Sequence, residues 1–546
     1  MKSDSSVLRD FTVDRRVWLL SAISIVIGIG AALLAVILLK AIALATNIFY
    51  YHRLSFVSVG PAGSPLGYWM PLVPIVGGLI VGLMARFGSD KIRGHGIPEA
   101  IESILLNGAK VPPSIAVLKP ISAAISIGSG GPFGAEGPII MTGGAFGSLI
   151  AQWIHLTDAE RTTLLVAGAA AGMSATFSAP LSAILLGVEL LLFEWRPRSL
   201  IPVAFASVTA EVLRVLLLGS GPLFAMPEMP FQQSASVCVL ALLLGLGVGV
   251  AAAALSRLMY GFEDLFERLP VHWMWWPAIG GIGIGLGGWF FPRGLGVGYD
   301  NIAELLRGNA PLTLLLGLIV GKSLIWAFSL GSGTSGGVLA PLLMIGGAMG
   351  ELAAHAAHAS APEQALWAAV AMGAMLAGSL GVPLTAILFT LEITRSLPVL
   401  LPVMLGCLAA YAMTSLIMPR SILTEKLSRR GYHLTREYGI DPLEIVTIAE
   451  IMREAEPAER AAAATLLPEV YAYSDETSRA AVEKMATSGL TTMLVVDRNS
   501  NTVCGKIGLK DLLLGRRKRA QRESQRRRVF ALMNREDESS ATKLGV

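Results

Sequence analysis

Long apolar runs separated by short polar segments fill the first 430 residues of the chain. Each run is long enough to cross a hydrocarbon core of about 30 Å as a helix. Several runs contain glycine or proline, which membrane proteins tolerate where a broken helix lines a cavity walled by protein. The pattern predicts an all-α polytopic membrane protein, with runs at about 17–46, 69–86, 162–193, 201–219, 236–258, 275–291, 311–330, 365–391 and 397–418.

After Met418 the apolar runs give way to an ordinary mixture of charged, polar and apolar residues. Within this region, residues 468–514 have the periods and turn residues of strand, helix, strand, turn, strand and helix. A small cytoplasmic α/β domain is therefore predicted. The expected organisation is a cytoplasmic N-terminus (1–16), a transmembrane domain (17–430), the α/β module (440–515) and a basic tail (516–546).

Composition and charge support this membrane assignment. The chain of 546 residues is 53% hydrophobic and 15% charged, with a mean hydropathy of +0.62, outside the range of soluble globular proteins. Basic residues precede the first run, and residues 516–528 contain eight in thirteen. The positive-inside rule then predicts that both termini are cytoplasmic and that the number of full crossings is even. The first run lacks the cleavage pattern of a signal peptide, so an anchor is expected.

Metal, redox and enzymatic chemistry find little support in the sequence. Cys238, Cys407 and Cys504 are isolated from one another, which argues against a structural zinc site or a disulfide framework. His355 and His358 are closely spaced, but we expect them in a loop. No catalytic residues, metal site, cofactor or nucleic-acid partner are predicted, and an intramembrane enzyme remains only a remote alternative.

The membrane part contains an internal repeat. The segment "GSGGPFGAEGPIIMTGGAFGSL" (128–149) aligns without gaps with "GSGTSGGVLAPLLMIGGAMGEL" (331–352), and 11 of 22 positions are identical. A second match, between 180–189 and 383–392, has the same offset of 203 residues. Blocks 128–189 and 331–392 are therefore predicted to be duplicated, as in transporters whose substrate site lies between two repeats.

Glu136 is charged, whereas its equivalent in the other repeat copy, Leu339, is apolar. A carboxylate at the bilayer centre costs about 2.5–3.5 kcal/mol on insertion scales, so it must face a cavity or a partner. Pro138 indicates a helix start, and the free N–H groups of a helix N-terminus bind anions. A salt bridge is the alternative, although no Lys or Arg lies between Lys119 and Arg161.

The same arrangement of glycines before a proline occurs at "GHGIPEA" (94–100) and "GGVLAP" (336–341). Three glycine-rich loops thus lead into three helix starts. If these starts converge, they form a cation-free site for a small, weakly hydrated anion, with a protonatable acid as its competitor. The alternative is that these turns are plain helix connectors.

Together, "GHGIPEA", "GAEGP" (134–138) and "GVLAP" (337–341) resemble the motifs of the CLC family of chloride channels and proton-coupled anion antiporters. The resemblance implies a homodimer with one pore per subunit, each pore built from two inverted repeats of broken helices, about eighteen helical segments in all. It implies that Glu136 is the external gate. It also assigns the anion path to His95, Gly96, Ile97, Gly134, Ala135, Gly137, Val338, Leu339 and Leu423, and the helix starts to Gly94, Pro98, Pro138, Gly337 and Pro341.

Three side chains at the expected site depart from the family pattern, so the identity of the transported anion stays open. His95 stands where chloride-selective members usually have serine, Leu339 replaces an aromatic residue, and Leu423 replaces a tyrosine. Chloride, nitrate, bicarbonate and other small anions are all compatible with these changes. A neutral imidazole at position 95 could donate one N–H to the anion, or the ring could be turned aside.

Proton coupling depends on a second acid near the inner side. Glu189 aligns with the first acid of the family's pair, but Leu190 follows it where many antiporters have the proton acceptor. Glu194, or Glu189 itself, could serve as the inner proton acceptor, and the alternative for Glu194 is a pair with Arg196. The sequence therefore predicts proton/anion exchange with a passive channel as the alternative.

The module at 468–514 resembles a CBS domain, a type that often binds adenosine nucleotides. Only one clear copy is present, and Gly508 occupies a position that is often Ser or Thr. Nucleotide binding and a dimer-stabilising role are both retained. The basic tail could attract anionic lipids, and the cytoplasmic (inner) membrane is the expected location.

Overall fold

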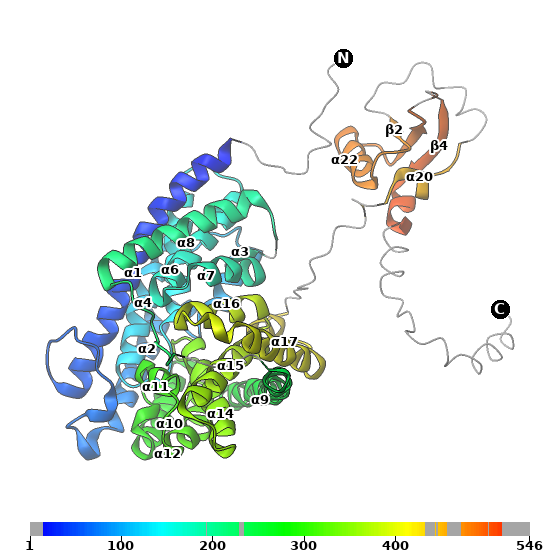
Figure 1. Cartoon of the computed structure of the whole chain (residues 1–546). Helices are drawn as coiled ribbons and strands as arrows, with labels where there is room; N and C mark the ends of the chain where they lie inside the picture. The colour runs from blue at the N-terminus through cyan, green and yellow to red at the C-terminus, as the bar shows by residue number, and fades with distance from the viewer. Residues whose placement is uncertain are drawn as a thin grey trace. The chain divides into compact units, whose positions relative to one another are not determined.

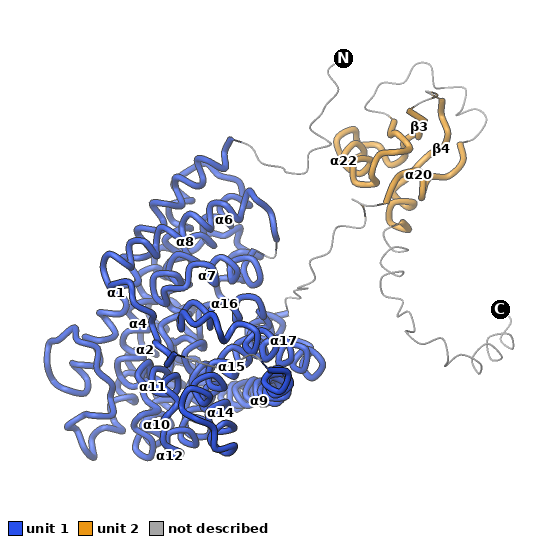
Figure 2. Tube along the Cα trace, in the orientation of Figure 1, with its two compact units in different colours: residues 1–436 blue, residues 437–546 orange. Residues whose placement is uncertain are grey.

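The structure, a computed structural model, describes residues 15–192, 194–228, 234–431, 443, 446–455, 471–498, 500 and 502–515. The chain forms two compact units, residues 1–436 and 437–546 (Figure 2). This division falls between the predicted transmembrane domain and the predicted α/β module. The basic tail at 516–546 and most of the predicted N-terminal segment lie outside the described residues.

The described part of unit 1 is built from helices α1 to α18 (Figure 1). This confirms the expected all-α architecture of about eighteen helical segments. Two π-helical segments, η4 (Gly187–Leu192) and η7 (Gly317–Lys322), continue α7 and α12. The helices are α1 (Arg16–Tyr51), α2 (Leu72–Phe87), α3 (Ile97–Leu106), α4 (Pro113–Gly128), α5 (Glu136–Gln152), α6 (Asp158–Phe177), α7 (Pro180–Leu186), α8 (Pro197–Leu218), α9 (Ala235–Glu267), α10 (Trp276–Phe290), α11 (Tyr299–Leu305), α12 (Leu312–Leu316), α13 (Ser323–Gly331), α14 (Leu339–Ala356), α15 (Ala361–Leu380), α16 (Pro383–Thr394), α17 (Leu400–Ile417) and α18 (Ile422–Arg429).

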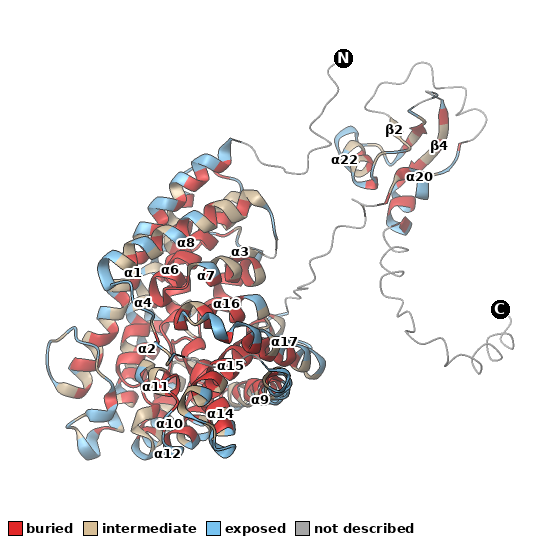
Figure 3. Cartoon of the chain, in the orientation of Figure 1, coloured by how far each residue is buried: buried red, intermediate tan, exposed pale blue. Residues whose placement is uncertain are grey.

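Helix length and burial fit a membrane domain. Among the described residues, seven helical stretches are long and apolar enough to cross a bilayer: Arg16–Tyr51, Gly67–Phe87, Pro197–Leu218, Ala235–Glu267, Leu312–Gly331, Leu339–Ala356 and Leu397–Arg429. Others, such as α3 with 10 residues and α11 with 7, are too short to do so and are broken helices. Outer helices such as α1 and α9 expose apolar faces, while the centre is buried (Figure 3).

The internal repeat predicted from the sequence extends over most of unit 1. Helices α5, α6, α7 and α8 begin at residues 136, 158, 180 and 197, and α14, α15, α16 and α17 begin at 339, 361, 383 and 400. All four pairs have the offset of 203 residues found in the sequence. The two copies are therefore equivalent in their helices, as the predicted duplication requires.

Two glutamates hold the repeats together through exchanged contacts. The Glu189 carboxylate accepts hydrogen bonds from the N–H groups of Leu384 (3.2 Å) and Thr385 (2.8 Å), at the start of α16. Its repeat equivalent, Glu392, accepts from the N–H groups of Leu181 and Ser182 (both 2.8 Å), at the start of α7. Each acid thus caps the helix of the other repeat, where free N–H groups and the helix dipole favour negative charge. Such a reciprocal exchange is the mark of a local two-fold relation.

Unit 2 is a small α/β fold. Its four-stranded sheet has the order β1-β4-β3-β2, with β2 and β3 parallel and the other neighbours antiparallel. Apolar residues such as Ala472, Val495 and Ile507 form the core against the helices. The order β2, α22, β3, β4 and a final helix at 509–515 confirms the predicted pattern. The elements are α20 (Ile448–Ile451), β1 (Arg453–Glu454), β2 (Tyr471–Tyr473), α22 (Ser478–Ser488), β3 (Thr492–Val496) and β4 (Val503–Gly508).

Removal of one exchanged cap is expected to loosen the contact between repeats. Glu392→Ala leaves the starting N–H groups of α7 without their acceptor, which should lower the free energy of unfolding by about 1–3 kcal/mol. The thermal unfolding midpoint of the protein in detergent measures this loss. Glu189→Ala should behave alike, and Glu483→Ala, which removes an exposed acid of unit 2, should leave the midpoint of unit 1 unchanged. Equal midpoints for all three variants would contradict the capping role.

Candidate anion site

Three loops meet where α3, α5 and α14 begin. Gly134 and Gly337, equivalent residues of the two repeats, pair through two backbone hydrogen bonds, Gly134 N–H to Gly337 O (3.1 Å) and Gly337 N–H to Gly134 O (2.8 Å). The loop before α3 joins them, because Gly94 N–H donates to Gly333 O and Gly336 N–H donates to Gly94 O, both at 3.4 Å. The three predicted helix starts are therefore adjacent, and the structure brings together the motifs that the sequence singled out.

Glycine is required at this meeting point because no space is left for a side chain. A Cβ atom on Gly137 would overlap the carbonyl oxygen of His95, and the Cα of Gly337 lies close by. A Cβ on Gly337 would lie 2.6 Å from Oε2 of Glu136. Gly96, which precedes α3, has a φ of 89°, a value that L side chains rarely adopt. The glycine-rich motifs thus serve close backbone approach.

Glu136 is fully buried at the start of α5, and its carboxylate folds back over Gly134. The carboxylate interacts electrostatically with the backbone N–H groups of Glu136 itself and of Ala340, at the starts of α5 and α14. Neither oxygen makes a hydrogen bond of normal geometry within the described residues. The described residues also provide no ion pair to it within 4 Å. Backbone dipoles, rather than a salt bridge, therefore face this acid.

Two buried lysines fix the loops around the site. Lys119 Nζ donates to the carbonyl oxygens of Ile92 and Gly94, both at 2.8 Å. Lys322, its equivalent at the offset of 203, donates to those of Gly294 (2.8 Å) and Gly296 (3.1 Å). Both ammonium groups are fully buried, so these carbonyls compensate for their lost hydration. The sequence analysis missed their role, although two lysines at the repeat offset inside apolar runs were a usable signal.

His95 is 2% exposed, and neither ring nitrogen has a hydrogen-bond partner in the described part of the chain. It lines a cavity of about 680 Å³, called here the α18 cavity, together with Lys426 of α18 and Arg430, which directly follows that helix. An imidazole without a protein partner leaves one N–H free to donate to a ligand. Direct anion contact by His95 remains a prediction.

Leu423 lies fully buried in the first turn of α18, which packs against α3 and α15. The contact from α18 to the α3 loop is made by Lys426, whose Nζ lies 2.8 Å from Oε1 of Glu99. Glu99 Oε2 in turn accepts the N–H of Gly96 at 2.9 Å. The sequence analysis singled out neither Glu99 nor Lys426, because their pairing joins positions more than three hundred residues apart.

The other predicted path residues lie on the same three segments. Ile97 and Pro98 begin α3, Ala135 precedes α5, and Pro138 stands in its first turn. Val338 precedes α14, with Leu339, Ala340 and Pro341 in its first turn, and all of these residues are buried. Their part in anion binding remains a prediction.

The two acids considered as inner proton acceptors have fixed structural contacts. Glu189 caps α16, as described above. Glu194 pairs with Arg196 and Arg198, both at 3.5 Å, and accepts the hydroxyl of Ser199. For Glu194 the structure has the ion pair with Arg196 that the sequence left as the alternative.

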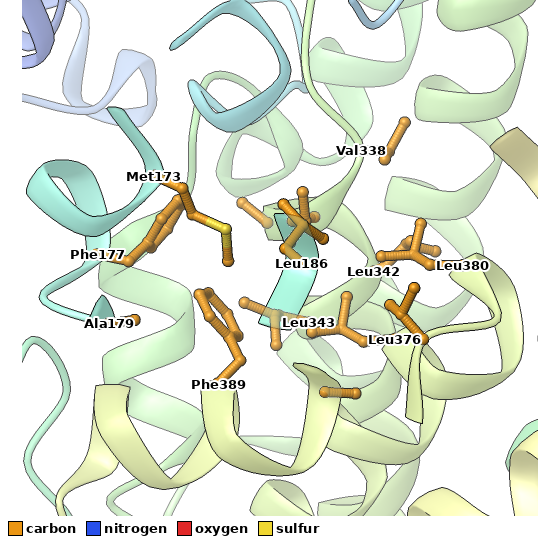
Figure 4. Packing of buried hydrophobic residues seen from close by; sticks show 14 of the residues in the cluster. Met173, Phe177, Ala179, Leu186, Val338, Leu342, Leu343, Leu376, Leu380 and Phe389 are labelled. Atoms are coloured by element: carbon orange, nitrogen blue, oxygen red, sulfur yellow. The ribbon is translucent and has the colours of Figure 1, made fainter. Parts of the chain in front are cut away.

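Loops next to Glu136 line two separate cavities. The α18 cavity includes Gly94, His95 and Gly333. A second cavity of about 830 Å³, called here the α11 cavity, is lined by residues 295–301 among others. Glu136 lines neither cavity, yet it interacts electrostatically with Lys322, which holds the wall of the α11 cavity. Beside Val338, apolar side chains from α6, α14, α15 and α16 close the packing (Figure 4).

No group of three or more His, Cys, Asp or Glu residues suited to a metal ion occurs in the described ranges. His355 lies in the last turn of α14, and His358 follows it with a φ of 54°. The expectation of a loop is therefore correct for His358 and wrong for His355, which lies inside α14.

Comparison with known proteins bears on this arrangement. The family model described as voltage gated chloride channel, the CLC family, matches residues 76–415. The chain belongs to this family. The match covers both repeats and all three loops, so the predicted CLC resemblance is confirmed.

Individual CLC relatives agree with this assignment. The H(+)/Cl(-) exchange transporter ClcA of Vibrio campbellii is 30% identical over 387 residues, covering 67% of this chain and 81% of that protein. A solved cyanobacterial Cl⁻/H⁺ antiporter superposes with a TM-score of 0.67 at 24% identity, over 77% of this chain and 99% of that one. A CLC-type fluoride/proton antiporter gives a TM-score of 0.61 at 20% identity, over 76% and 98%. The two structural matches support the fold.

The close approach at Gly137 generates a prediction. Gly137→Ala places a methyl group against the carbonyl of His95, and overpacking of this kind should cost about 1–3 kcal/mol of stability and separate the loops. Gly247→Ala, on an exposed face of α9 with no atom within 4 Å of the new Cβ, should be neutral or stabilising. Thermal unfolding and anion flux of both variants check this. A Gly137→Ala protein with normal stability and flux would disprove the steric argument.

Proposed function

We propose that this CLC protein carries small inorganic anions across the membrane in exchange for protons, with Glu136 as the gate. The observation that supports this most is the position of Glu136. A fully buried carboxylate lies against helix N-termini, without a salt bridge in the described residues, between loops that line two cavities. An acid in this position can block a path between the cavities and can also take up a proton.

The gating step follows from competition for the same backbone donors. When ionised, the carboxylate is attracted to the N–H groups at the starts of α5 and α14, where an anion would also bind. Protonation removes that attraction, so the side chain leaves and an anion takes its place. Return of the ionised side chain expels the anion. Each cycle therefore couples anion movement to uptake and release of one proton at Glu136.

Chloride or a related small anion is the proposed substrate. The site offers backbone N–H groups and the free nitrogens of His95, which suit a weakly hydrated monovalent anion. Leu339 and Leu423 add only apolar surface. The relatives named above as Cl⁻/H⁺ and fluoride/proton antiporters favour a halide, while nitrate and bicarbonate remain alternatives to be measured.

A passive anion channel is the second candidate. Leu190 stands where many antiporters have the inner proton acceptor, and both nearby acids, Glu189 and Glu194, make fixed contacts. A proton released by Glu136 toward the α18 cavity would then need another acceptor. In a channel, Glu136 would open and close the path without moving protons across the membrane.

The proposal also includes the oligomeric state, the orientation in the membrane and the role of unit 2. A homodimer in the inner membrane is expected because the chain belongs to the CLC family. Apolar side chains exposed on α8, α16 and α17, among them Phe205, Leu384 and Leu408, would suit a second copy or lipid. Both termini would face the cytoplasm, and the basic tail would contact anionic lipids. A CBS-type role for unit 2 in dimer stability is preferred over nucleotide binding, since Asp511 is held by Arg453 and the N–H of Gly508.

The direct test is transport by the purified protein in liposomes. Gradients of chloride, nitrate, bicarbonate and fluoride are imposed in turn, while anion efflux and external pH are recorded. We expect an anion gradient to drive protons uphill, and Glu136→Gln to abolish proton movement while anion flux continues, because the amide cannot ionise.

Two other results would contradict proton/anion exchange. Anion flux without proton movement, faster in Glu136→Gln, would establish the channel. Absence of flux for all four anions in both proteins would remove the transport proposal for these ions.

Selectivity is expected to depend on position 95. His95→Ser introduces the serine that chloride-selective CLC members usually have, and should raise chloride flux relative to nitrate by about ten-fold, the effect of one hydrogen bond of about 1.5 kcal/mol to a charged group. Flux ratios in liposomes measure the change. His272→Ser, which alters an exposed histidine, is the control. An unchanged ratio in His95→Ser would mean that only backbone groups contact the anion.

A further inference from the structure

Tyr299 carries a buried hydroxyl group at the start of α11. Tyr299 begins α11, following a glycine-rich loop as Ile97 does at the start of α3. Its hydroxyl oxygen is enclosed and makes no hydrogen bond within the described ranges. The phenol interacts electrostatically with Glu136, and α11 packs against α14, whose Ala340 faces the Glu136 carboxylate. A buried hydroxyl without a partner is costly, which indicates that it is used in another arrangement of the site.

Aromatic neighbours hold the Tyr299 ring in place. Its centroid lies 6.3 Å from that of Phe177 and 5.9 Å from that of Phe224, both edge-on. Phe177 packs in turn on Phe389, with centroids 5.1 Å apart, and both rings are seen beside Met173 in Figure 4. Edge-to-face contacts of this kind restrict ring movement. The hydroxyl direction is therefore set by the packing.

The backbone that carries Tyr299 is also fixed. Lys322 binds the carbonyl oxygens of Gly294 and Gly296 just before it, and Gly298 turns the chain with a φ of 78°. Tyr299 itself lines the α11 cavity. Tyr299 thus forms part of the boundary of that cavity and also interacts electrostatically with Glu136.

Donor and acceptor are complementary at this boundary. Among the described residues, neither Glu136 oxygen nor the Tyr299 hydroxyl has a hydrogen bond of normal geometry. Lys322, the charged group that interacts with Glu136 among the described residues, already donates to two carbonyls. A turn of the Glu136 side chain toward α11 would let the phenol donate to the carboxyl group, and one hydrogen bond would satisfy both groups.

We propose that Tyr299 is the positioning residue that receives Glu136 when it leaves the anion path. The phenol holds the turned side chain by a hydrogen bond and so keeps the path open for an anion. Because this hydrogen bond stabilises the turned, protonated side chain, it raises the pH at which the path opens. This inference rests on the proposed gating by Glu136.

The first test is a structure of the Glu136→Gln variant, which imitates the protonated acid and does not depend on transport. The side-chain amide at position 136 is expected within about 3.2 Å of the Tyr299 hydroxyl. An amide that stays over Gly134, or turns away from α11, would overturn the proposal even if transport is established.

The second test is the pH profile of anion flux in Tyr299→Phe, which keeps the ring and removes the hydroxyl. At neutral pH the flux should fall about five-fold, the effect of one hydrogen bond. The loss should shrink in acid, where protonation opens the path, so the pH of half-maximal flux should move downward. In the Glu136→Ala background the same substitution should change neither the flux nor its pH profile.

A purely structural effect has a different signature. Tyr50→Phe, which removes a buried hydroxyl that donates to Ser129 O at 3.0 Å, is the matched control and should act equally in both backgrounds. Equal losses for Tyr299→Phe in both backgrounds would make its hydroxyl a fold or anion contact and overturn the proposal. So would an unchanged pH profile. If the unmodified protein moves no anion, the proposed function fails, and the structure of Glu136→Gln still decides the contact.

Discussion

The backbone pairing of Gly134 with Gly337 is the contact on which the rest of the transport domain depends. The two residues are repeat equivalents, and each donates its N–H to the other's carbonyl, so the local two-fold relation between the repeats passes through this pair. The exchanged caps of Glu189 and Glu392 obey the same relation. So do Lys119 and Lys322, which hold equivalent loops. Three kinds of polar contact thus fix one symmetric scaffold, and each satisfies backbone groups that lipid could not solvate.

The chemistry of the site comes from breaking that symmetry. Leu339 stands where the other repeat has Glu136, and Ile97 begins α3 where Tyr299 begins α11. Two identical repeats would give equivalent helix starts that meet at an uncharged, apolar point. In the proposed mechanism a single acid makes this crossing respond to protonation, and a single phenol on one side receives the acid when it turns. The polar additions are few because each buried charge in a membrane domain must be compensated.

The sequence predicts features that depend on neighbouring residues, but not contacts between residues far apart along the chain. The duplication, the helix starts at Pro98, Pro138 and Pro341 and the unusual place of Glu136 were all readable, because local glycine and proline patterns carry them. The partners of buried side chains were not. Glu189 was considered a proton acceptor, yet its carboxylate meets N–H groups almost two hundred residues away. Glu99 and Lys426 are likewise joined only by the fold. Periodicity specifies elements, whereas such pairs depend on how the elements pack.

The altered side chains at the site are understandable if backbone groups do most of the binding. His95, Leu339 and Leu423 differ in polarity from the residues usual at these positions in the CLC family. The glycine-rich loops before α3, α5 and α14 nevertheless hydrogen-bond to one another and approach closely. Helix starts supply the same partial positive charge whatever side chain stands beside them. In the proposed mechanism, side chains adjust the size of the site and the number of hydrogen-bond donors and so influence the choice among anions, while the charge of Glu136 controls access to the path. Selectivity and gating can therefore vary independently on one scaffold.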